Sequence, residues 1–289
     1  MLRGELSRRR LDRAVAVLRH LSVLLAIDVG NTNVTLGLFE LGPDKRLVHQ
    51  FRMESARQRT ADEYAVTVRQ LLAMNDVDPK KIDAAILASV VPTLTDTVVE
   101  LTKRAFGITP LVVGPGMKTG VAILIDNPRE VGADRIVNAV AAHERCIAGG
   151  DTSTGVIVVD FGTATTFDVV SPKGEYVGGV ICPGILISAD ALFARAAKLP
   201  RVEVTRPPKA IGKNTQHAMQ SGLFYGYVAL VDGMVHRLRG ELPYEARVLA
   251  TGGLARLIAP ASDTLEEVDE DLTLVGLRIL YERNTLGEG

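Results

Sequence analysis

Two stretches of this chain decide its fold: Leu24–Asn33 (LLAIDVGNTN) and Val156–Thr165 (VIVVDFGTAT). Each is a short aliphatic run, then Asp-x-Gly, then small polar residues, and a second β-rich run follows each copy. Such runs predict buried strands, and a glycine after the aspartate permits a tight turn. Two unrelated hairpins with glycine turns are the alternative. Because one copy lies in each half of the chain, we expect two similar domains around a cleft.

Composition narrows the class of protein. A chain of 289 residues with 47% hydrophobic and 23% charged residues is typical of a soluble globular protein with two domains. The net charge of −1 and the absence of Trp argue against a nucleic-acid partner. No apolar stretch is long enough to span a bilayer. Cys146 and Cys182 have no metal-site spacing, so we expect a cytoplasmic protein with no membrane partner.

The first residues differ from the rest because arginines crowd there, at positions 3, 8, 9, 10, 13 and 19. A secretory signal needs an uninterrupted apolar core, which this segment lacks. A basic amphipathic helix on a membrane surface is an alternative. We expect residues 1–23 to form a flexible N-terminal extension.

The remaining chain has the pattern of an α/β protein. In the first half we expect strands at 24–29, 34–40, 47–53, 84–90 and 111–113, and helices at 60–74, 94–106 and 133–146. Thr60 and Glu63 form a capping-box signal for the first of these helices. In the second half we expect strands at 156–160, 166–171, 176–181 and 248–250, and helices at 185–198, 215–238 and 271–284. The Gly- and Thr-rich segment 149–155 predicts a boundary between an N-terminal domain, 24–150, and a C-terminal domain, 151–289.

Several familiar motifs are absent, including the P-loop, the dinucleotide-binding fingerprint, Gly-x-Ser-x-Gly and His-Glu-x-x-His. A different set occurs in order: DVGNTN at 28–33, DNP at 126–128, GADR at 132–135, DFGTAT at 160–165, GGVICPG at 178–184 and GKNT at 212–215. From Leu24 to Asn284 the chain thereby resembles the type III pantothenate kinases. That family shares a duplicated actin-like (ribonuclease H-like) ATPase fold with sugar kinases and Hsp70-type chaperones, which the duplicated sequence pattern independently favours.

The resemblance implies a reaction. It is the ATP-dependent phosphorylation of the terminal hydroxyl of pantothenate to 4'-phosphopantothenate, the first step of coenzyme A biosynthesis. It further implies Mg2+, a monovalent cation (K+ or NH4+) and a homodimer whose active site lies near the subunit interface.

The resemblance also implies residues for the nucleotide and its cations. ATP would contact the first turn and one residue of the second, namely Asp28, Val29, Gly30, Asn31, Thr32, Asn33, Val34, Thr35 and Thr163. Asp28 would hold Mg2+, directly or through water. Asp160 would bind the monovalent cation, which adds positive charge where an evident phosphate-binding Lys is missing. Turn chemistry alone can also explain Asn31 and Asn33. Gly252-Gly253 would let the adenine lie against the backbone, although a simple helix entry fits these glycines equally well.

The resemblance places pantothenate on Gly132, Ala133, Asp134 and Arg135, and on Thr215 of a neighbouring subunit. Asp134 would be the general base, with helix capping as the alternative. Arg135 would bind the polar end of pantothenate or pair with a neighbouring acid. Thr215 could instead be the N-cap of the long helix that follows.

One residue departs from the family pattern: Ile125 lies where many members have a Tyr that contacts pantothenate. We interpret Asp168, in the strand after the second turn, as structural. Two other functions remain open, a kinase of the same superfamily acting on a sugar or small acid, and a non-catalytic nucleotide-binding regulator. Intact Asp28, Asp134 and Asp160 argue against the regulator.

Overall fold

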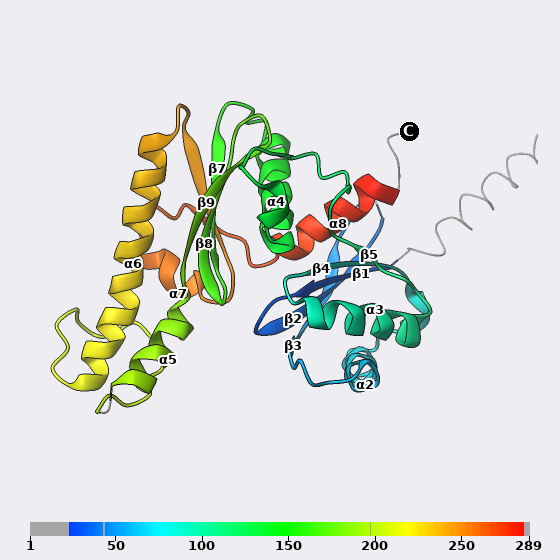
Figure 1. The fold of residues 1–289 in the computed structure, drawn as a ribbon, viewed down its shortest axis with the longest axis horizontal. Helices are drawn as coiled ribbons and strands as arrows, with labels where there is room; N and C mark the ends of the chain where they lie inside the picture. Colours follow the sequence, from blue (N-terminus) through cyan, green and yellow to red (C-terminus); the bar gives the residue numbers. More distant parts are fainter. Residues whose placement is uncertain (1–22, 43, 197, 286–289) are drawn as a thin grey trace, which may run out of the picture. The chain divides into compact units, whose positions relative to one another are not determined.

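The computed structural model describes residues 23–42, 44–196 and 198–285. The chain forms two compact units that divide between Gly114 and Pro115 (Figure 1). This division differs from the boundary expected at residue 150, because α4 (Ala133–Ala148) packs against α8 (Leu272–Thr285) and β7 (Gly155–Phe161) of the second unit. Val23 begins the first strand, and the rest of the extension expected at 1–23 lies outside the described residues.

The first unit contains a five-stranded sheet in the order β3-β2-β1-β4-β5. Its strands are β1 (Val23–Val29), β2 (Asn33–Glu40), β3 (Leu47–Glu54), β4 (Ile82–Ser89) and β5 (Leu111–Val112). The first three are joined as antiparallel neighbours, whereas β4 is parallel to β1 and β5 is parallel to β4. This mixed order differs from that of an all-parallel sheet and places the first turn, at the end of β1, beside the end of β4.

Two helices cover one face of this sheet, α2 (Ala61–Ala73) and α3 (Pro92–Phe106). Alternate residues of β1, such as Leu25 and Ile27, pack with helix residues in the core, as the period of two in a strand requires. The capping box at the start of α2 is confirmed, because Thr60 N–H donates to Glu63 Oε2 at 2.7 Å and Glu63 N–H donates to Thr60 Oγ1 at 3.3 Å.

The second unit repeats the strand order of the first. Its sheet runs β11-β10-β7-β8-β9-β6, with β6 (Ala122–Ile123), β8 (Ala164–Val170), β9 (Glu175–Pro183), β10 (Ala246–Thr251) and β11 (Glu267–Val268). The segment β9-β8-β7-β10-β11 matches β3-β2-β1-β4-β5 in both order and direction. The predicted duplication is therefore confirmed, and the chain has the duplicated actin-like α/β fold.

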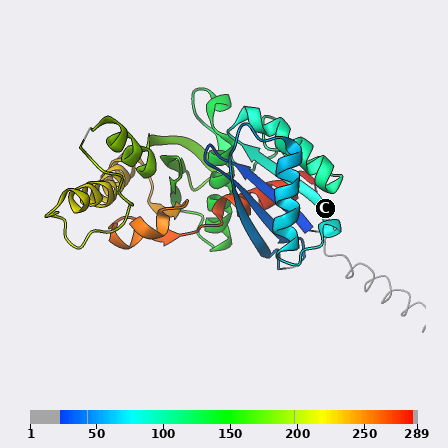
Figure 2. The same ribbon diagram turned by 90° about the horizontal axis from the view of Figure 1, so that it is seen from below.

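The two faces of the second sheet are covered by different helices (Figures 1 and 2). One face packs in a hydrophobic core with α5 (Ile185–Arg195), α6 (Thr215–Glu241) and α7 (Ala255–Ile258). The other face contacts α4, which in turn packs against α8. Because strand residues alternate, Ile157, Val159 and Phe161 of β7 enter the core, and Asp160 points to the side of α4, where Asn138 bonds it.

The structure contains several short elements that the sequence did not predict. They are β6, β11, α7 and the 3-10 turns η1 (Pro79–Lys81), η2 (Pro128–Glu130) and η3 (Ala259–Ala261). None of them is long enough to show a hydrophobic period, which is the signal used to predict strands and helices. Within the described ranges, no helix has the length and apolar character needed to cross a membrane.

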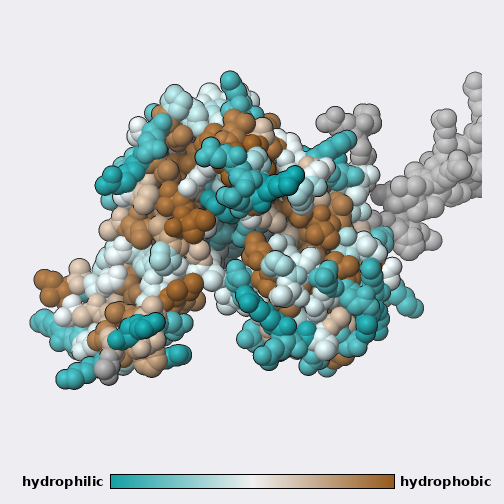
Figure 3. All heavy atoms as spheres, viewed as in Figure 1, coloured by the Kyte–Doolittle hydropathy of each residue, from teal (hydrophilic) through white to brown (hydrophobic). Residues whose placement is uncertain are grey.

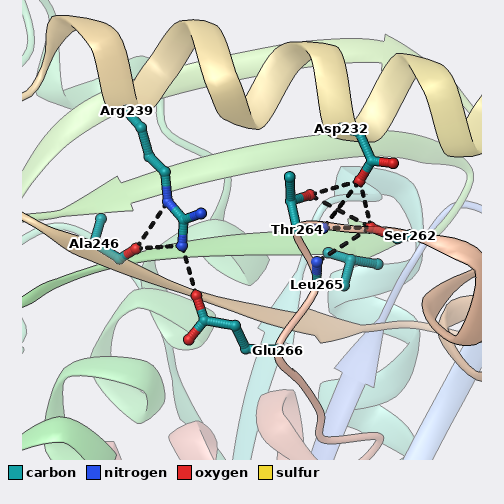
Figure 4. A network of polar contacts seen from close by, with 7 residues as sticks. All are labelled: Asp232, Arg239, Ala246, Ser262, Thr264, Leu265 and Glu266. Atoms are coloured by element: carbon teal, nitrogen blue, oxygen red, sulfur yellow. Dashed lines mark hydrogen bonds and ion pairs between the residues drawn. The ribbon is translucent and has the colours of Figure 1, made fainter.

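A polar network fastens α6 to the segment before β11 (Figure 4). Asp232 Oδ1 accepts hydrogen bonds from Ser262 Oγ at 2.5 Å and from Thr264 Oγ1 at 2.8 Å, and Asp232 Oδ2 accepts from Asp263 N–H at 3.2 Å. Two turns further along α6, the guanidinium of Arg239 donates to Ala246 O. Although burial opposes its ionisation, the hydrogen bonds from Ser262 and Thr264 keep the pKa of Asp232 below its usual value.

We predict that Asp232→Ala lowers the stability of the second unit by about 2 kcal/mol, because it leaves several donors without their charged acceptor. A lowered folded-state pKa means that the carboxylate stabilises the fold above its unfolded pKa, and that this contribution disappears as pH falls through the folded-state value. The difference in thermal unfolding midpoint between Asp232→Ala and wild type should therefore be largest near neutral pH and shrink in acid. Glu241→Gln, at the exposed end of α6, is the control; a pH-independent difference would contradict the assignment.

Candidate active site

The first turn joins β1 to β2 in the first unit. Gly30 N–H donates to Asn33 O at 2.9 Å, and Ser55 Oγ donates to Gly30 O at 2.6 Å. Asn31 and Thr32 are exposed at its tip, whereas the side chains of Val29 and Val34 are buried in the core. Of the residues expected to contact ATP, these two valines therefore offer only backbone atoms.

The second turn has the same construction with one residue fewer. Asp160 is the last residue but one of β7 and pairs with Thr166 of β8, as Asp28, the last but one of β1, pairs with Thr35 of β2. Gly162 N–H donates to Ala164 O at 3.1 Å, and Thr163 is exposed at the tip. Both turns thus present exposed small residues immediately after an aspartate, an arrangement that suits phosphate oxygens.

Asp134 lies in the first turn of α4. The N-cap is Gly132, which has no side chain to cap the helix, and Asp134 Oδ1 accepts a hydrogen bond from Arg135 N–H at 2.8 Å. Burial raises the pKa of Asp134 more than the interactions with Arg135 lower it. Asp134 is therefore not the N-cap, and its carboxylate has the raised proton affinity that a general base needs.

Asp160 is held by a chain of hydrogen bonds that reaches α8. Asn138 Nδ2 donates to Asp160 Oδ2 at 3.2 Å, and Thr273 Oγ1 donates to Asn138 Oδ1 at 2.8 Å. The bond from Thr273 fixes the amide of Asn138 with its NH2 group toward the carboxylate. Burial, followed by the nearby charges of Asp134 and Asp168, raises the pKa of Asp160 to about 7.

The other carboxylate oxygen of Asp160 faces glycine backbone. A Cβ added at Gly252, where φ is 89°, would overlap Asp160 Oδ1, and one added at Gly162 would lie 3.6 Å from it. Gly252 is thus required for close approach to Asp160, which places the Gly252-Gly253 segment, expected near the adenine, beside the second turn. The side-chain hydrogen bond from Asn138 goes to Oδ2 and not to this oxygen.

Arg135 forms an ion pair with Asp168 in the interior of the second unit. Its Nε lies 2.7 Å from Asp168 Oδ1, a carboxylate with no exposed surface. Tyr176 OH donates to the same oxygen at 2.7 Å, and Thr166 Oγ1 donates to Asp168 Oδ2 at 3.2 Å. The structural role expected for Asp168 is therefore to hold the side chain of Arg135, a predicted substrate-binding residue.

Thr215 lies elsewhere in the second unit, at the first position of α6. The cap of this helix is Asn214, whose Oδ1 accepts from His217 N–H at 2.8 Å, so the N-cap alternative for Thr215 is wrong. Thr215 lines a groove of about 760 Å³ between α5 and α6 together with Ser188, Leu192, Leu199, Gly212, Lys213, Asn214, Ala218, Met219, Gly222, Leu223 and Tyr227. None of these residues belongs to the cluster around Asp160.

The short strand β6 brings Ile125 to the edge of the second sheet. Leu124 N–H donates to Tyr176 O at 2.8 Å. The Cγ2 atom of Ile125 lies 3.8 Å from the point where a Cβ at Gly178 would be, and Gly178 has a φ of 127°. An apolar side chain thus stands beside the glycine segment of β9, where the resemblance expects a tyrosine.

The structure brings Asp134, Arg135 and Asp160 together in the second unit, while the predicted contacts from Asp28 to Thr35 belong to the first unit. Sequence analysis missed Asn138, Tyr176 and Thr273. Asn138 follows Asp134 by one helical turn, which is a signal that could have placed it on the same face. Tyr176 and Thr273 give no such signal, because their contacts join distant segments.

The two expected cations, Mg2+ and a monovalent cation, would be held by different kinds of site. Across the described part of the chain, no group of three or more His, Cys, Asp or Glu side chains is arranged to hold a metal ion. A single carboxylate with water and phosphate oxygens suffices for Mg2+. For the monovalent cation the candidate is the buried carboxylate of Asp160, whose Oδ1 faces glycine backbone and whose pKa is raised. A cation bound there would offset the free-energy cost of burying the negative charge.

Comparison with known proteins decides the family. The profile of the type III pantothenate kinases matches residues 24–237. The chain belongs to this family. It is 57% identical over 262 residues to a type III pantothenate kinase of Myxococcus xanthus (strain DK1622), covering 91% of this chain and 99% of that protein. With a type III pantothenate kinase of Anaeromyxobacter sp. (strain Fw109-5), the identity is 59% over 262 residues, covering 91% of this chain and 100% of that protein.

Solved structures that resemble this type III pantothenate kinase family member are distant in sequence. A reductive activator for a corrinoid, iron-sulfur protein has a TM-score of 0.52 at 13% identity, covering 91% of this chain and 60% of that one. A conserved Baf family protein from Campylobacter jejuni has a TM-score of 0.51 at 16% identity, covering 90% and 97%. These two similarities concern the fold alone.

We predict that Asp160→Asn stabilises the ligand-free protein. The folded-state pKa of about 7 exceeds the usual 3.8, so the native carboxyl destabilises the fold increasingly as pH rises between these values. In buffer without K+, the gain in thermal unfolding midpoint should grow from about pH 4 to about pH 8. Asp263→Asn, an exposed position, is the control and should show no gain; equal midpoints for Asp160→Asn and wild type at every pH would contradict the raised pKa.

Proposed function

We propose that this chain transfers the terminal phosphoryl group of ATP to the terminal hydroxyl of pantothenate. The observation that supports this most is that the 57% identity to a type III pantothenate kinase accompanies an acidic cluster in which Asp134 has a raised proton affinity. The product is 4'-phosphopantothenate, which is the first intermediate on the route to coenzyme A.

Asp134 is the general base in this proposal. As the hydroxyl oxygen of pantothenate approaches phosphorus, the carboxylate of Asp134 orients it and accepts its proton. The transition state of phosphoryl transfer is loose, so the proton moves late and positioning contributes most of the rate. The hydrogen bond from Arg135 N–H to Asp134 Oδ1 leaves the second oxygen for the substrate.

The two Asp-x-Gly turns bind the phosphates in this proposal. Small residues at 31–33 and at 163 donate to phosphate oxygens, since the N–H groups of Gly30 and Gly162 are used within the turns. Asp28 would hold Mg2+, through water or directly, and Asp160 would hold K+ or NH4+. When bound, these cations neutralise charge that develops on the transferred group.

The active enzyme in this proposal is a homodimer. Hydrophobic side chains are exposed on β9, α5 and the segment before α6, notably Ile181, Leu186, Ile187, Leu192, Phe193 and Ile211, the last of which is 83% exposed. Figure 3 shows such hydrophobic surface on the second unit, mixed with hydrophilic side chains. A second copy packed on this surface would place its groove, with Thr215, at the interface.

Two other activities give different results in the same experiment. A kinase for a sugar or small acid releases ADP only when its own acceptor is added, so the assay is repeated with a panel of sugars and small acids in place of pantothenate. A nucleotide-binding regulator binds ATP and releases no ADP with any acceptor. The deciding measurement is ADP release with ATP, Mg2+ and K+, in the presence and absence of pantothenate, with the product identified by mass. Release that does not depend on pantothenate contradicts the proposal.

In the same assay we predict that Asp134→Asn folds and dimerises but loses kcat by about a hundredfold or more, because the amide cannot accept the proton. Circular dichroism and gel filtration check the fold and the dimer. Asp96→Asn, which removes an exposed carboxylate from α3, is the matched control and should keep the wild-type rate. Normal turnover by a folded Asp134→Asn protein would end the assignment of the base.

We further predict that replacing K+ with Na+ lowers turnover by about tenfold or more, because Na+ is smaller and cannot replace K+ at a site built for the larger ion. The Asp160→Asn variant should turn over at one low rate in either salt. Steady-state rates in matched chloride buffers are the measurement. Full activity in Na+ alone would contradict the assignment of a K+ or NH4+ site to Asp160.

A further inference from the structure

The guanidinium of Arg135 is hydrogen-bonded at one end and unpaired at the other. Its Nε donates to Asp168 Oδ1 at 2.7 Å, and the Arg135 side chain is 16% exposed. Its Nη2 is buried and, within the described residues, has no hydrogen-bond partner. A buried guanidinium nitrogen without an acceptor is costly, so an oxygen supplied by a ligand is the expected partner.

Asp168 is itself fixed by Tyr176. The Tyr176 hydroxyl donates to the same Oδ1 that receives Arg135 Nε, and the Arg135 Cζ atom lies 5.8 Å from the centre of the Tyr176 ring. Burial and the charge of Asp168 raise the pKa of Tyr176, so its phenol stays protonated and remains a donor. One tyrosine therefore contacts both members of the ion pair.

The strand β9 comes close to Nη2 at a glycine. In the register of β8 and β9, Asp168 is opposite Gly179. A Cβ at Gly179 would overlap Phe167 O and would lie 2.8 Å from Arg135 Nη2. Any other residue here would collide with Phe167 O and crowd Nη2, so the glycine is required for the close approach of β9 to this nitrogen.

The ion pair also keeps Arg135 apart from the base. Arg135 follows Asp134 directly, yet the hydrogen bond between them in the described residues comes from the backbone N–H, not from the guanidinium. If the guanidinium paired with Asp134 instead, it would occupy the carboxylate and lower its proton affinity. Asp168 competes for the guanidinium and leaves Asp134 available.

We infer that Tyr176 and Asp168 are positioning residues for pantothenate phosphorylation, which hold Arg135 so that Nη2 donates to an acceptor oxygen of pantothenate. This inference rests on the proposed function. Arg135 touches the substrate, and Tyr176 and Asp168 act only through Arg135. Binding of pantothenate, rather than of ATP, therefore depends on the Tyr176 hydroxyl.

The test compares two tyrosine variants of the full chain. Tyr176→Phe removes the hydroxyl that orients Asp168 and keeps the ring. Tyr244→Phe is the matched control, because the Tyr244 hydroxyl is also buried but has no partner among the described residues. We expect Tyr176→Phe to raise KM for pantothenate about tenfold, with KM for ATP, kcat and the thermal midpoint close to wild type. Tyr244→Phe should leave both KM values unchanged.

A second measurement tests whether Asp168 and Tyr176 can hold a free guanidinium ion in place of the Arg135 side chain. Arg135→Ala should lose pantothenate affinity, and added guanidinium ion, well below denaturing concentration, should partly restore it because Asp168 and Tyr176 still form the site. In the double variant Arg135→Ala/Asp168→Asn the same addition should restore nothing. Equal restoration in both variants would overturn the inference.

The outcomes separate the two proposals. Wild-type protein that releases no ADP with pantothenate contradicts the proposed function. Active wild type together with a Tyr176→Phe variant that behaves like Tyr244→Phe contradicts the positioning role alone. An equal rise in KM for ATP and for pantothenate would likewise contradict it, because it would indicate a general structural loss.

Discussion

The ion pair between Arg135 and Asp168 joins α4 to β8 in a place where three carboxylates lie close to one guanidinium. Asp168 has no exposed surface, and the charges of Asp134 and Asp168 both raise the pKa of Asp160. Burying so many carboxylates costs stability, and a well-packed apolar cluster would stabilise the fold more. The proposed reaction accounts for this arrangement, because each of the three side chains would interact with a ligand. A cation would bind Asp160, the substrate hydroxyl would bind Asp134, and a substrate oxygen would bind Arg135.

Duplication of the fold provides two equivalent turns that have diverged. Both follow the central strand of a sheet, and both aspartates pair with a Thr of the next strand. In the second turn, Asn138 from α4 and Thr273 from α8 fix one oxygen of Asp160. The first turn instead exposes Asn31 and Thr32. One scaffold thereby offers an exposed turn, which we propose binds phosphate, and a buried carboxylate, which we propose binds a cation.

Local signals in the sequence were sufficient for much of the fold. The aliphatic runs before Asp28 and Asp160 predicted both central strands, and Thr60 with Glu63 predicted a capping box that the structure contains. The Gly-rich segment at 149–155 has the composition of a linker, whereas the packing of α4 on α8 groups that helix with the second unit. Asn214, rather than Thr215, caps α6 because either residue type can cap and only the backbone geometry decides.

The parts of the site that sequence could not supply are contacts between distant segments. Tyr176 reaches Asp168 across neighbouring strands, and Thr273 lies 135 residues from Asn138, so no spacing rule indicates them. The central claim is that Asp134 receives the substrate hydroxyl while Arg135 binds the same molecule. The most direct test is a crystal structure with pantothenate, Mg2+, K+ and a non-hydrolysable ATP analogue. The account predicts the terminal hydroxyl at about 3 Å from an Asp134 carboxylate oxygen, and a pantothenate oxygen on Arg135 Nη2. Pantothenate bound away from both residues would contradict it.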